Sequence, residues 1–339
     1  MHSHPSLPPF APSSAIPLPS RPSVPADLSP ISPLSYFDTA SSVSLSSYSF
    51  RVFHSGTSIP ALTIPAPEPV VRGPSPLNPS APMCFVLHHG GGYSAASFGL
   101  VAKRLREMDP ACAVVAWDCR GHGESKADVA EETVLTARIK EDLSLSRLSA
   151  DTVELVETMG LHTCGRDLVF VGHSLGGAVV VDAVKQGRWT NVLGVVVVDV
   201  VEGSAKDSLR HMHTYIHSRP SRFFAVADAV RWSLTSSTIR TPEAARLTMP
   251  PLVVPAPPGD ERAERGGPGL EWRTDLAATE EFWDGWFEDL SAKFLSVRAA
   301  KLLVLAGTDR LDTPLMIGQM QGKFQLTVIQ DSGHLVCTP

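Results

Sequence analysis

Short, nearly continuous apolar runs alternate with amphipathic segments along most of the chain. Residues 97–108 and 148–159 carry apolar positions at helical spacing. Uninterrupted apolar strands separated by helices indicate a parallel sheet that is covered on both faces. The pattern therefore predicts an α/β fold with a mostly parallel, doubly wound sheet. The runs expected to be strands are residues 84–87, 113–117, 168–171, 192–198, 301–306 and 325–329.

The regular alternation stops between residues 203 and 295. This stretch holds helical segments that carry aromatic residues, and its middle, residues 250–269, is rich in proline, glycine and charge. Such a pattern is typical of a helical cap inserted between strands of the sheet, with a flexible loop of its own.

The N-terminal part has a different composition. Of the 29 prolines, 18 lie in residues 1–82, and serine fills much of the space between them. Residues 1–28 are expected to be disordered, because they cannot bury enough apolar surface to fold. Residues 48–53 alternate as a strand does, residues 59–82 then suggest a proline-rich insertion in a hairpin connection, and the ordered domain is expected to begin near Ser29.

Charge and cysteine content exclude several classes of partner. The formal net charge of −6 and the lack of basic clusters argue against binding to nucleic acid or an anionic membrane surface. Five widely spaced cysteines without a C-x-x-C pair fit reduced thiols, and no apolar stretch reaches the roughly 18 residues of a membrane span. We expect a cytoplasmic monomer without cofactor or metal; nuclear residence is unsupported by any basic cluster.

The most informative motif is Gly172-His173-Ser174-Leu175-Gly176, a G-x-S-x-G sequence between a predicted strand and a predicted helix. In this context the motif predicts a nucleophile elbow, a tight turn that exposes the serine at the start of the helix. The hydroxyl of Ser174 needs a base, and the base needs an orienting acid. This arrangement predicts an α/β-hydrolase fold.

The base is expected in a loop after the last strand, where Asp331-Ser332-Gly333-His334 supplies His334. Two aspartates could orient it. Asp309 follows the penultimate strand and lies 25 residues before His334, and Asp199 follows the strand after the elbow helix, 25 residues beyond Ser174. Spacing alone favours Asp309 but leaves Asp199 open.

The oxyanion of an acyl-transfer intermediate needs two backbone N–H donors. We expect one from Leu175, directly after the nucleophile, and one from the glycine-rich turn at residues 89–92, with Gly91 favoured and Gly92 open. The segment at residues 118–125, D-C-R-G-H-G-E-S, follows a strand, and we interpret it as structural, so His122 is not a candidate base.

Several longer motifs resemble those of the protein phosphatase methylesterases, which remove the methyl ester from the C-terminal leucine of the protein phosphatase 2A catalytic subunit. The resemblance extends over residues 29–334. It rests on residues 87–98, 172–178, 198–203, 272–273, 282–287 (F-W-D-G-W-F) and 305–324, which include I-G-Q-M-Q-G-K-F.

The resemblance implies that Asp199, which precedes Val-Val-Glu-Gly, is the triad acid, reversing the preference from spacing. It implies that the cap aromatics Trp283, Trp286 and Phe287 help form a groove for the phosphatase tail. Ser174 would attack the leucine ester with His334 as base, release methanol, and then be freed by water. Two alternatives remain open: a general small-molecule carboxylesterase, and a non-catalytic phosphatase-binding protein.

The chain also departs from the family pattern at its end. Only five residues follow His334, which leaves no room for the terminal helix that normally packs on the sheet. We therefore expect a C-terminal fragment of low stability, with the loop that holds His334 poorly anchored.

Overall fold

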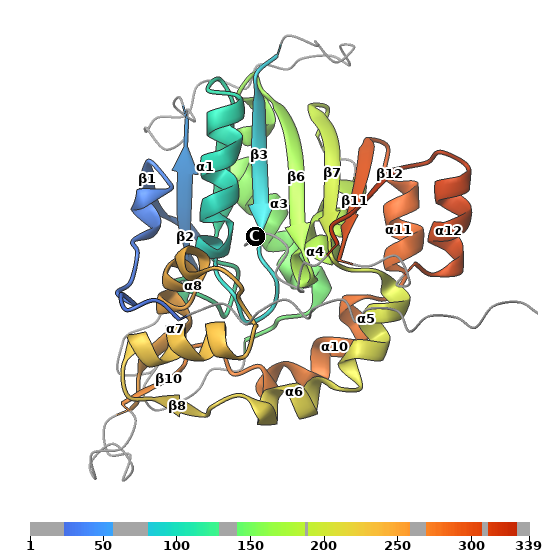
Figure 1. The fold of residues 1–339 in the computed structure, drawn as a ribbon. Coiled ribbons are helices and arrows are strands. Elements are labelled where there is room, and N and C mark those ends of the chain that lie inside the picture. Colours follow the sequence, from blue (N-terminus) through green and yellow to red (C-terminus); the bar gives the residue numbers. More distant parts are fainter. Residues whose placement is uncertain are drawn as a thin grey trace, which may run out of the picture.

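A mixed nine-stranded sheet forms the centre of the molecule (Figure 1). The structure, a computed structural model, describes residues 24–56, 81–128, 141–186, 189–257, 269–306 and 311–330. Six strands of this sheet, β4, β3, β6, β7, β11 and β12, pair in parallel, whereas β1, β2 and β5 pair in antiparallel fashion at one edge. In spatial order the strands are β1 (Thr39–Leu45), β2 (Tyr48–Ser55), β4 (Ala113–Trp117), β3 (Met83–His88), β6 (Asp167–His173), β7 (Val192–Val198), β11 (Ala300–Leu305) and β12 (Gln325–Val328), with β5 (Lys126–Ala127) on β2.

Helices cover both faces of this sheet. The 3₁₀ helix η3 (Ala95–Phe98) and helix α1 (Gly99–Met108) lie on one face, and α3 (Leu145–Thr158) and α4 (Leu175–Lys185) lie on the other (Figure 1). Because successive strand residues point to opposite faces, β4 contributes side chains to the hydrophobic cores on both faces of the sheet. Val114 belongs to the core on the face covered by α1, and Val115 belongs to the core on the face covered by α4. This double covering explains why the strands are apolar without interruption.

The cap lies across the carboxyl ends of the parallel strands (Figure 1). Its small antiparallel sheet β8-β10-β9 was not anticipated from the helical pattern. The cap elements are α5 (Glu202–Leu209), α6 (Met212–Ser218), β8 (Arg222–Phe223), α7 (Val226–Thr235), α8 (Pro242–Thr248), η5 (Pro250–Leu252), β9 (Val253–Pro255), β10 (Leu270–Trp272), η6 (Ala277–Phe282) and α10 (Trp283–Trp286).

Helix α11 (Leu290–Ser296) covers the sheet and is not part of the cap. Its Lys293 forms an ion pair with Asp182 of α4 at 3.2 Å, and its Phe294 packs edge-on against Phe324, with ring centroids 5.4 Å apart. The cap therefore ends before residue 290, earlier than the predicted boundary of 295. The remaining elements are η1 (Pro33–Ser35), η4 (Leu161–Thr163) and α12 (Thr313–Met320).

The six predicted strands are confirmed with small shifts of their ends, and the predicted strand at residues 48–53 starts where β2 starts and ends two residues before β2 does. The predicted hairpin connection through residues 59–82 is wrong. Strand β2 pairs with β1 and β4, whereas β3 pairs in parallel with β4 and β6, so this segment joins strands that are not neighbours. Residues 57–80 themselves lie outside the described residues.

Two predicted segment boundaries also need correction. Residues 250–257 do not belong to a flexible loop, because Leu252 and Val253 are buried and β9 pairs with β10; residues 258–268 lie outside the described part of the chain. At the N-terminal side, the described chain begins at residue 24, and Leu28 is buried in the core on the α1 side. The ordered domain thus includes at least Leu28, which falls in the segment predicted to be disordered, residues 1–28.

Candidate active site

Ser174 lies in a strained turn between β6 and α4. Its backbone has φ 52° and ψ −123°, a conformation that L-residues rarely adopt. The flanking glycines allow it. A Cβ on Gly172 would lie 2.2 Å from the carbonyl oxygen of Gly176, and a Cβ on Gly176 would lie 2.2 Å from that of His88. Since backbone atoms would collide in both cases, the motif requires glycine at both positions, as the nucleophile elbow predicts.

Asp199 lies beside Ser174 at the end of the neighbouring strand. In the parallel register His173 of β6 pairs with Val198 of β7, so Ser174 and Asp199 are the residues that follow one register pair. Asp199 also has a positive φ of 52°. Adjacent strands are about 4.8 Å apart, and the two residues line the same cavity.

The Asp199 carboxylate is fixed by the sheet. Its Oδ1 accepts a hydrogen bond from the N–H of Ala306 at 2.9 Å, and its own N–H donates to the carbonyl of Val304 at 2.7 Å. Its exposed fraction is 2%. A buried carboxylate held by strand β11 in this way is suited to orient an imidazole rather than to contact bulk water.

The other two candidates for the triad lie outside the described residues. His334 falls in residues 331–339, and Asp309 falls in residues 307–310. Their roles therefore stay predictions. Nearby Asp312 is structural: its carboxylate caps α12 by accepting from the N–H of Leu315 at 3.0 Å, and it accepts a hydrogen bond from Ser291 at 2.5 Å.

The structure favours Gly91 over Gly92 as the oxyanion donor in the turn at residues 89–92, hereafter the oxyanion turn. The N–H of Gly92 donates to Nε2 of His122 at 2.8 Å, so it is already engaged. The N–H of Gly91 makes no hydrogen bond within the described part of the chain. Leu175 begins α4, where the first N–H groups have no acceptor inside the helix. Gly91 and Leu175 are close, since a Cβ on Gly91 would lie 3.7 Å from Cδ2 of Leu175.

Buried neutral histidines support the oxyanion turn. His122 donates from Nδ1 to the carbonyl of Arg120 at 2.8 Å, which leaves Nε2 as the acceptor for Gly92. His89 donates to the carbonyl of Gly90 at 2.8 Å and accepts from the N–H of Cys119 at 2.9 Å. Burial lowers the pKa of His122 to about 4 and the pKa of His89 well below its ordinary value. His122 is thus a structural acceptor.

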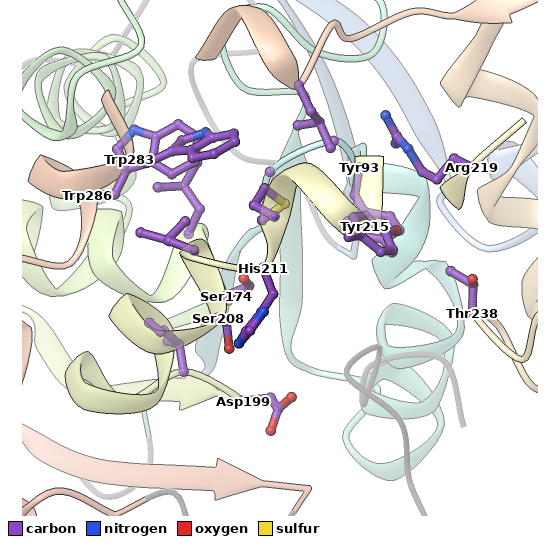
Figure 2. A pocket seen from close by; sticks show the side chains of 18 of the residues that line it. Tyr93, Ser174, Asp199, Ser208, His211, Tyr215, Arg219, Thr238, Trp283 and Trp286 are labelled. Carbon is purple, nitrogen blue, oxygen red and sulfur yellow. The ribbon is translucent and has the colours of Figure 1, made fainter. Parts of the chain in front are cut away.

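Above these residues the cap encloses a cavity of about 500 Å³. Figure 2 shows Trp283 and Trp286 of α10 on one side of the pocket, and Tyr215 and Arg219 on the other. The indole N–H of Trp283 donates to Oγ1 of Thr279 and that of Trp286 to the carbonyl of Leu143, both at 2.8 Å. These indoles are buried, and they also line the cavity. The predicted cap aromatics Trp283, Trp286 and Phe287 therefore line the cavity beside Ser174, and its use as a groove for the phosphatase tail stays a prediction.

Within the described residues, no cluster of histidine, cysteine, aspartate or glutamate has the arrangement of a metal site. The helices of the described segments also include none that is long and apolar enough to cross a membrane.

Comparisons with known proteins agree with this geometry. Residues 85–338 match the model of the Alpha/beta hydrolase family. Protein phosphatase methylesterase 1 of Emericella nidulans is 46% identical over 271 residues, covering 77% of this chain and 64% of that protein. The protein of the same name from Cryptococcus neoformans var. neoformans serotype D is 38% identical over 321 residues, covering 91% of this chain and 74% of that protein.

The chain belongs to the protein phosphatase methylesterase family of alpha/beta hydrolases. It spans less than two thirds of the length of the Emericella relative. Solved structures are more distant. E-2-(Acetamidomethylene)succinate hydrolase aligns with a TM-score of 0.61 at 19% identity, over 88% of this chain and 93% of that one. An esterase from Mycobacterium tuberculosis aligns with a TM-score of 0.57 at 18% identity, over 88% and 87%. These two likenesses concern the fold alone.

Sequence reasoning missed two groups of residues in this methylesterase-family site. His122 was assigned to a structural segment, but its contact with the oxyanion turn was not foreseen; the D-x-R-G-H-G pattern after a strand was the available signal. The pocket residues Tyr215 and Arg219 were also missed, because nothing in the pattern of the cap indicates which polar residues face inward.

Proposed function

We propose that this chain is a serine carboxylic ester hydrolase that demethylates the C-terminal leucine of the protein phosphatase 2A catalytic subunit. The observation that carries the proposal is the meeting of Ser174, Asp199 and the oxyanion turn at one capped cavity. The choice of substrate is supported by relatives named protein phosphatase methylesterase 1.

In the proposed mechanism the hydroxyl of Ser174 attacks the ester carbonyl while His334 accepts its proton. The N–H groups of Gly91 and Leu175 stabilise the oxyanion of the tetrahedral intermediate. His334 then protonates the departing methoxide, and methanol leaves an acyl-enzyme on Ser174. Water, deprotonated by the same histidine, attacks the acyl-enzyme and releases the free leucine carboxylate. Asp199 holds His334 in the required tautomer and stabilises the imidazolium.

The cavity fits an ester that carries an apolar side chain and an extended tail. Leu276, Trp283 and Trp286 give an apolar wall close to the oxyanion turn, since a Cβ on Gly91 would lie 4.0 Å from the Trp286 ring and one on Gly92 would lie 3.0 Å from Leu276. A leucine side chain would gain about 1.5–3 kcal/mol by leaving water for such a surface.

The direct test is methanol release from the phosphatase 2A catalytic subunit with a methylated C-terminal leucine. A short-chain p-nitrophenyl ester is run in parallel, and Ser174→Ala is the control for both. We expect methanol release from the parent chain and a loss of more than a hundred-fold in Ser174→Ala, because losing a triad member costs several orders of magnitude.

The outcomes separate the alternatives. Turnover of the p-nitrophenyl ester without release of methanol from the phosphatase would contradict the proposed substrate and favour a general carboxylesterase. Binding of the phosphatase, retained in Ser174→Ala but without turnover of either ester by the parent chain, would favour a non-catalytic binding protein.

A further inference from the structure

Arg219 brings a positive charge to the cavity that the mechanism above does not use. It follows α6, and its guanidinium carbon lies 4.4 Å from the ring centroid of Trp272 and 5.6 Å from that of Tyr215. Figure 2 shows Arg219 beside Tyr215 and Tyr93, on the side of the pocket away from Trp283 and Trp286. The cation lies against the faces of aromatic rings, which attract it, and its side chain also forms a hydrogen bond with Tyr215.

The charge of Arg219 is not neutralised by a carboxylate. Within the described residues Arg219 forms no ion pair, and its buried Nε has no hydrogen-bond partner. Two other arginines of the cap do form ion pairs: Arg222 lies 3.4 Å from Glu271, and Arg231 lies 2.7 Å from Asp228. Burial lowers the pKa of Arg219, while Tyr215, Tyr93 and Asp275 raise it by smaller amounts. The guanidinium nevertheless stays protonated.

A partly buried cation whose Nε donor has no partner among the described residues is costly unless it meets an anion. The ester at Ser174 is neutral, so the anion must come from another part of the substrate. A planar guanidinium presents parallel N–H groups that match a carboxylate. A cavity of about 500 Å³ that includes both Ser174 and Arg219 has room for more than the esterified residue.

We propose that Arg219 binds the carboxylate of an aspartate or glutamate that lies a few residues before the esterified C-terminus of the substrate. This inference rests on the proposed function, since it assumes a peptide ester. The formal net charge of the chain is −6, so its overall field does not attract acidic peptides. Selection for an acidic residue then depends on this local contact.

The test uses binding, so that it does not depend on turnover. Fluorescently labelled hexapeptides of alanine, each ending in leucine methyl ester, carry either aspartate or asparagine at one of the four positions before the leucine. Their affinities are measured by fluorescence anisotropy for the full chain with Ser174→Ala. We expect aspartate to bind roughly ten-fold or more tightly than asparagine at one position, as is usual for a hydrogen bond to a charged group.

Arg219→Gln in the Ser174→Ala background should abolish the preference for aspartate, and Arg219→Lys should keep part of it. The matched control is Arg231→Gln, which removes an exposed arginine that pairs with Asp228 and does not line the cavity, and it should leave the preference intact. Equal affinity for aspartate and asparagine at all four positions would overturn the inference. So would an Arg219→Gln variant that binds both peptides more weakly to the same degree.

Failure of this inference can be told apart from failure of the proposed function. If the parent chain releases methanol from the methylated phosphatase but the peptides show no preference for aspartate, only the proposed role of Arg219 is contradicted. Absence of methanol release from the parent chain would remove the proposed function, whatever the peptides show.

Discussion

At the scale of single residues, the contact between His122 and Gly92 gives the oxyanion turn its orientation. Loss of a direct oxyanion donor lowers kcat by about 10²–10³-fold. His122 is not such a donor, because it contacts the oxyanion turn through the N–H of Gly92. We expect His122→Ala to lower kcat by roughly ten-fold with little change in KM. His122→Gln, which can still accept from Gly92, should recover part of the loss. Steady-state methanol release measures both, and a change confined to KM would contradict this role.

The kcat values of two variants can show whether Asp199 or Asp309 is the triad acid. Asp199→Asn keeps the shape of the side chain, whose Oδ1 accepts from the N–H of Ala306. The amide no longer favours the tautomer that His334 needs as the base. We expect a loss of about 10³–10⁴ in kcat for Asp199→Asn. Asp309→Asn should lose less than ten-fold. The reverse order of the two variants would restore the preference for Asp309 that spacing alone suggested.

At the scale of elements, the strand–turn–helix unit of β6 and α4 tolerates no side chain at its glycines. In Gly176→Ala the new Cβ would lie 2.2 Å from the His88 carbonyl oxygen, so β3 and α4 must separate. We expect a destabilisation of more than about 2 kcal/mol, as is usual for overpacking against a rigid core. Gly285→Ala in α10 is the matched control, because within the described residues its new Cβ would meet no atom within 4 Å apart from its chain neighbours and its own helix backbone. Urea unfolding should show that variant unchanged or slightly more stable.

Elements differ in how well their sequence predicts them. The strands β4 and β7 were predicted with their observed ends, because every residue of β4 is buried, those of β7 are buried or half-buried, and both strands are continuous or nearly continuous apolar runs. Strands β8, β9 and β10 of the cap are two or three residues long, too short to show any alternation. Their pairing joins residues that are far apart in sequence, because Arg222 pairs with Glu271 and Val253 pairs with Trp272.

At the scale of the whole molecule, the site was predictable where a residue follows a strand. Ser174 and Asp199 each directly follow a parallel strand, and the carboxyl ends of such strands meet at one edge of the sheet. Position after a strand did not separate Asp199 from Asp309, however, and the choice of Asp199 came from the family resemblance. The roles of His122 and Arg219 were not predictable, since each depends on a turn or cap segment folding back over that edge. The hydrophobic pattern predicts which elements are buried, but it does not predict the direction in which a single polar side chain of a loop points.

The stability of the whole molecule should depend on pH through its buried histidines. Burial lowers the pKa of His88 and of His122 to about 4, and it lowers the pKa of His89 well below its ordinary value. Between about pH 6.5 and pH 4 the unfolded chain binds protons at these sites and the folded chain does not, so the free energy of unfolding falls as the pH falls. Burial of Asp118 raises its pKa to about 6 and opposes this trend, as does the raised pKa of Glu141, but the three histidines outnumber these two carboxyls.

Replacing one of these histidines should therefore make the free energy of unfolding depend less steeply on pH. His88 is suited to this test, because its Nε2 is buried without a hydrogen-bond partner among the described residues and its Nδ1 contacts only the carbonyl of His89, at 3.0 Å. In His88→Asn we expect the free energy of unfolding to change less steeply by about 1.4 kcal/mol per pH unit in the middle of the window. Urea unfolding between pH 4.5 and pH 7.5 measures this slope, and parallel curves for the variant and the parent chain would show that His88 titrates alike in the folded and unfolded states.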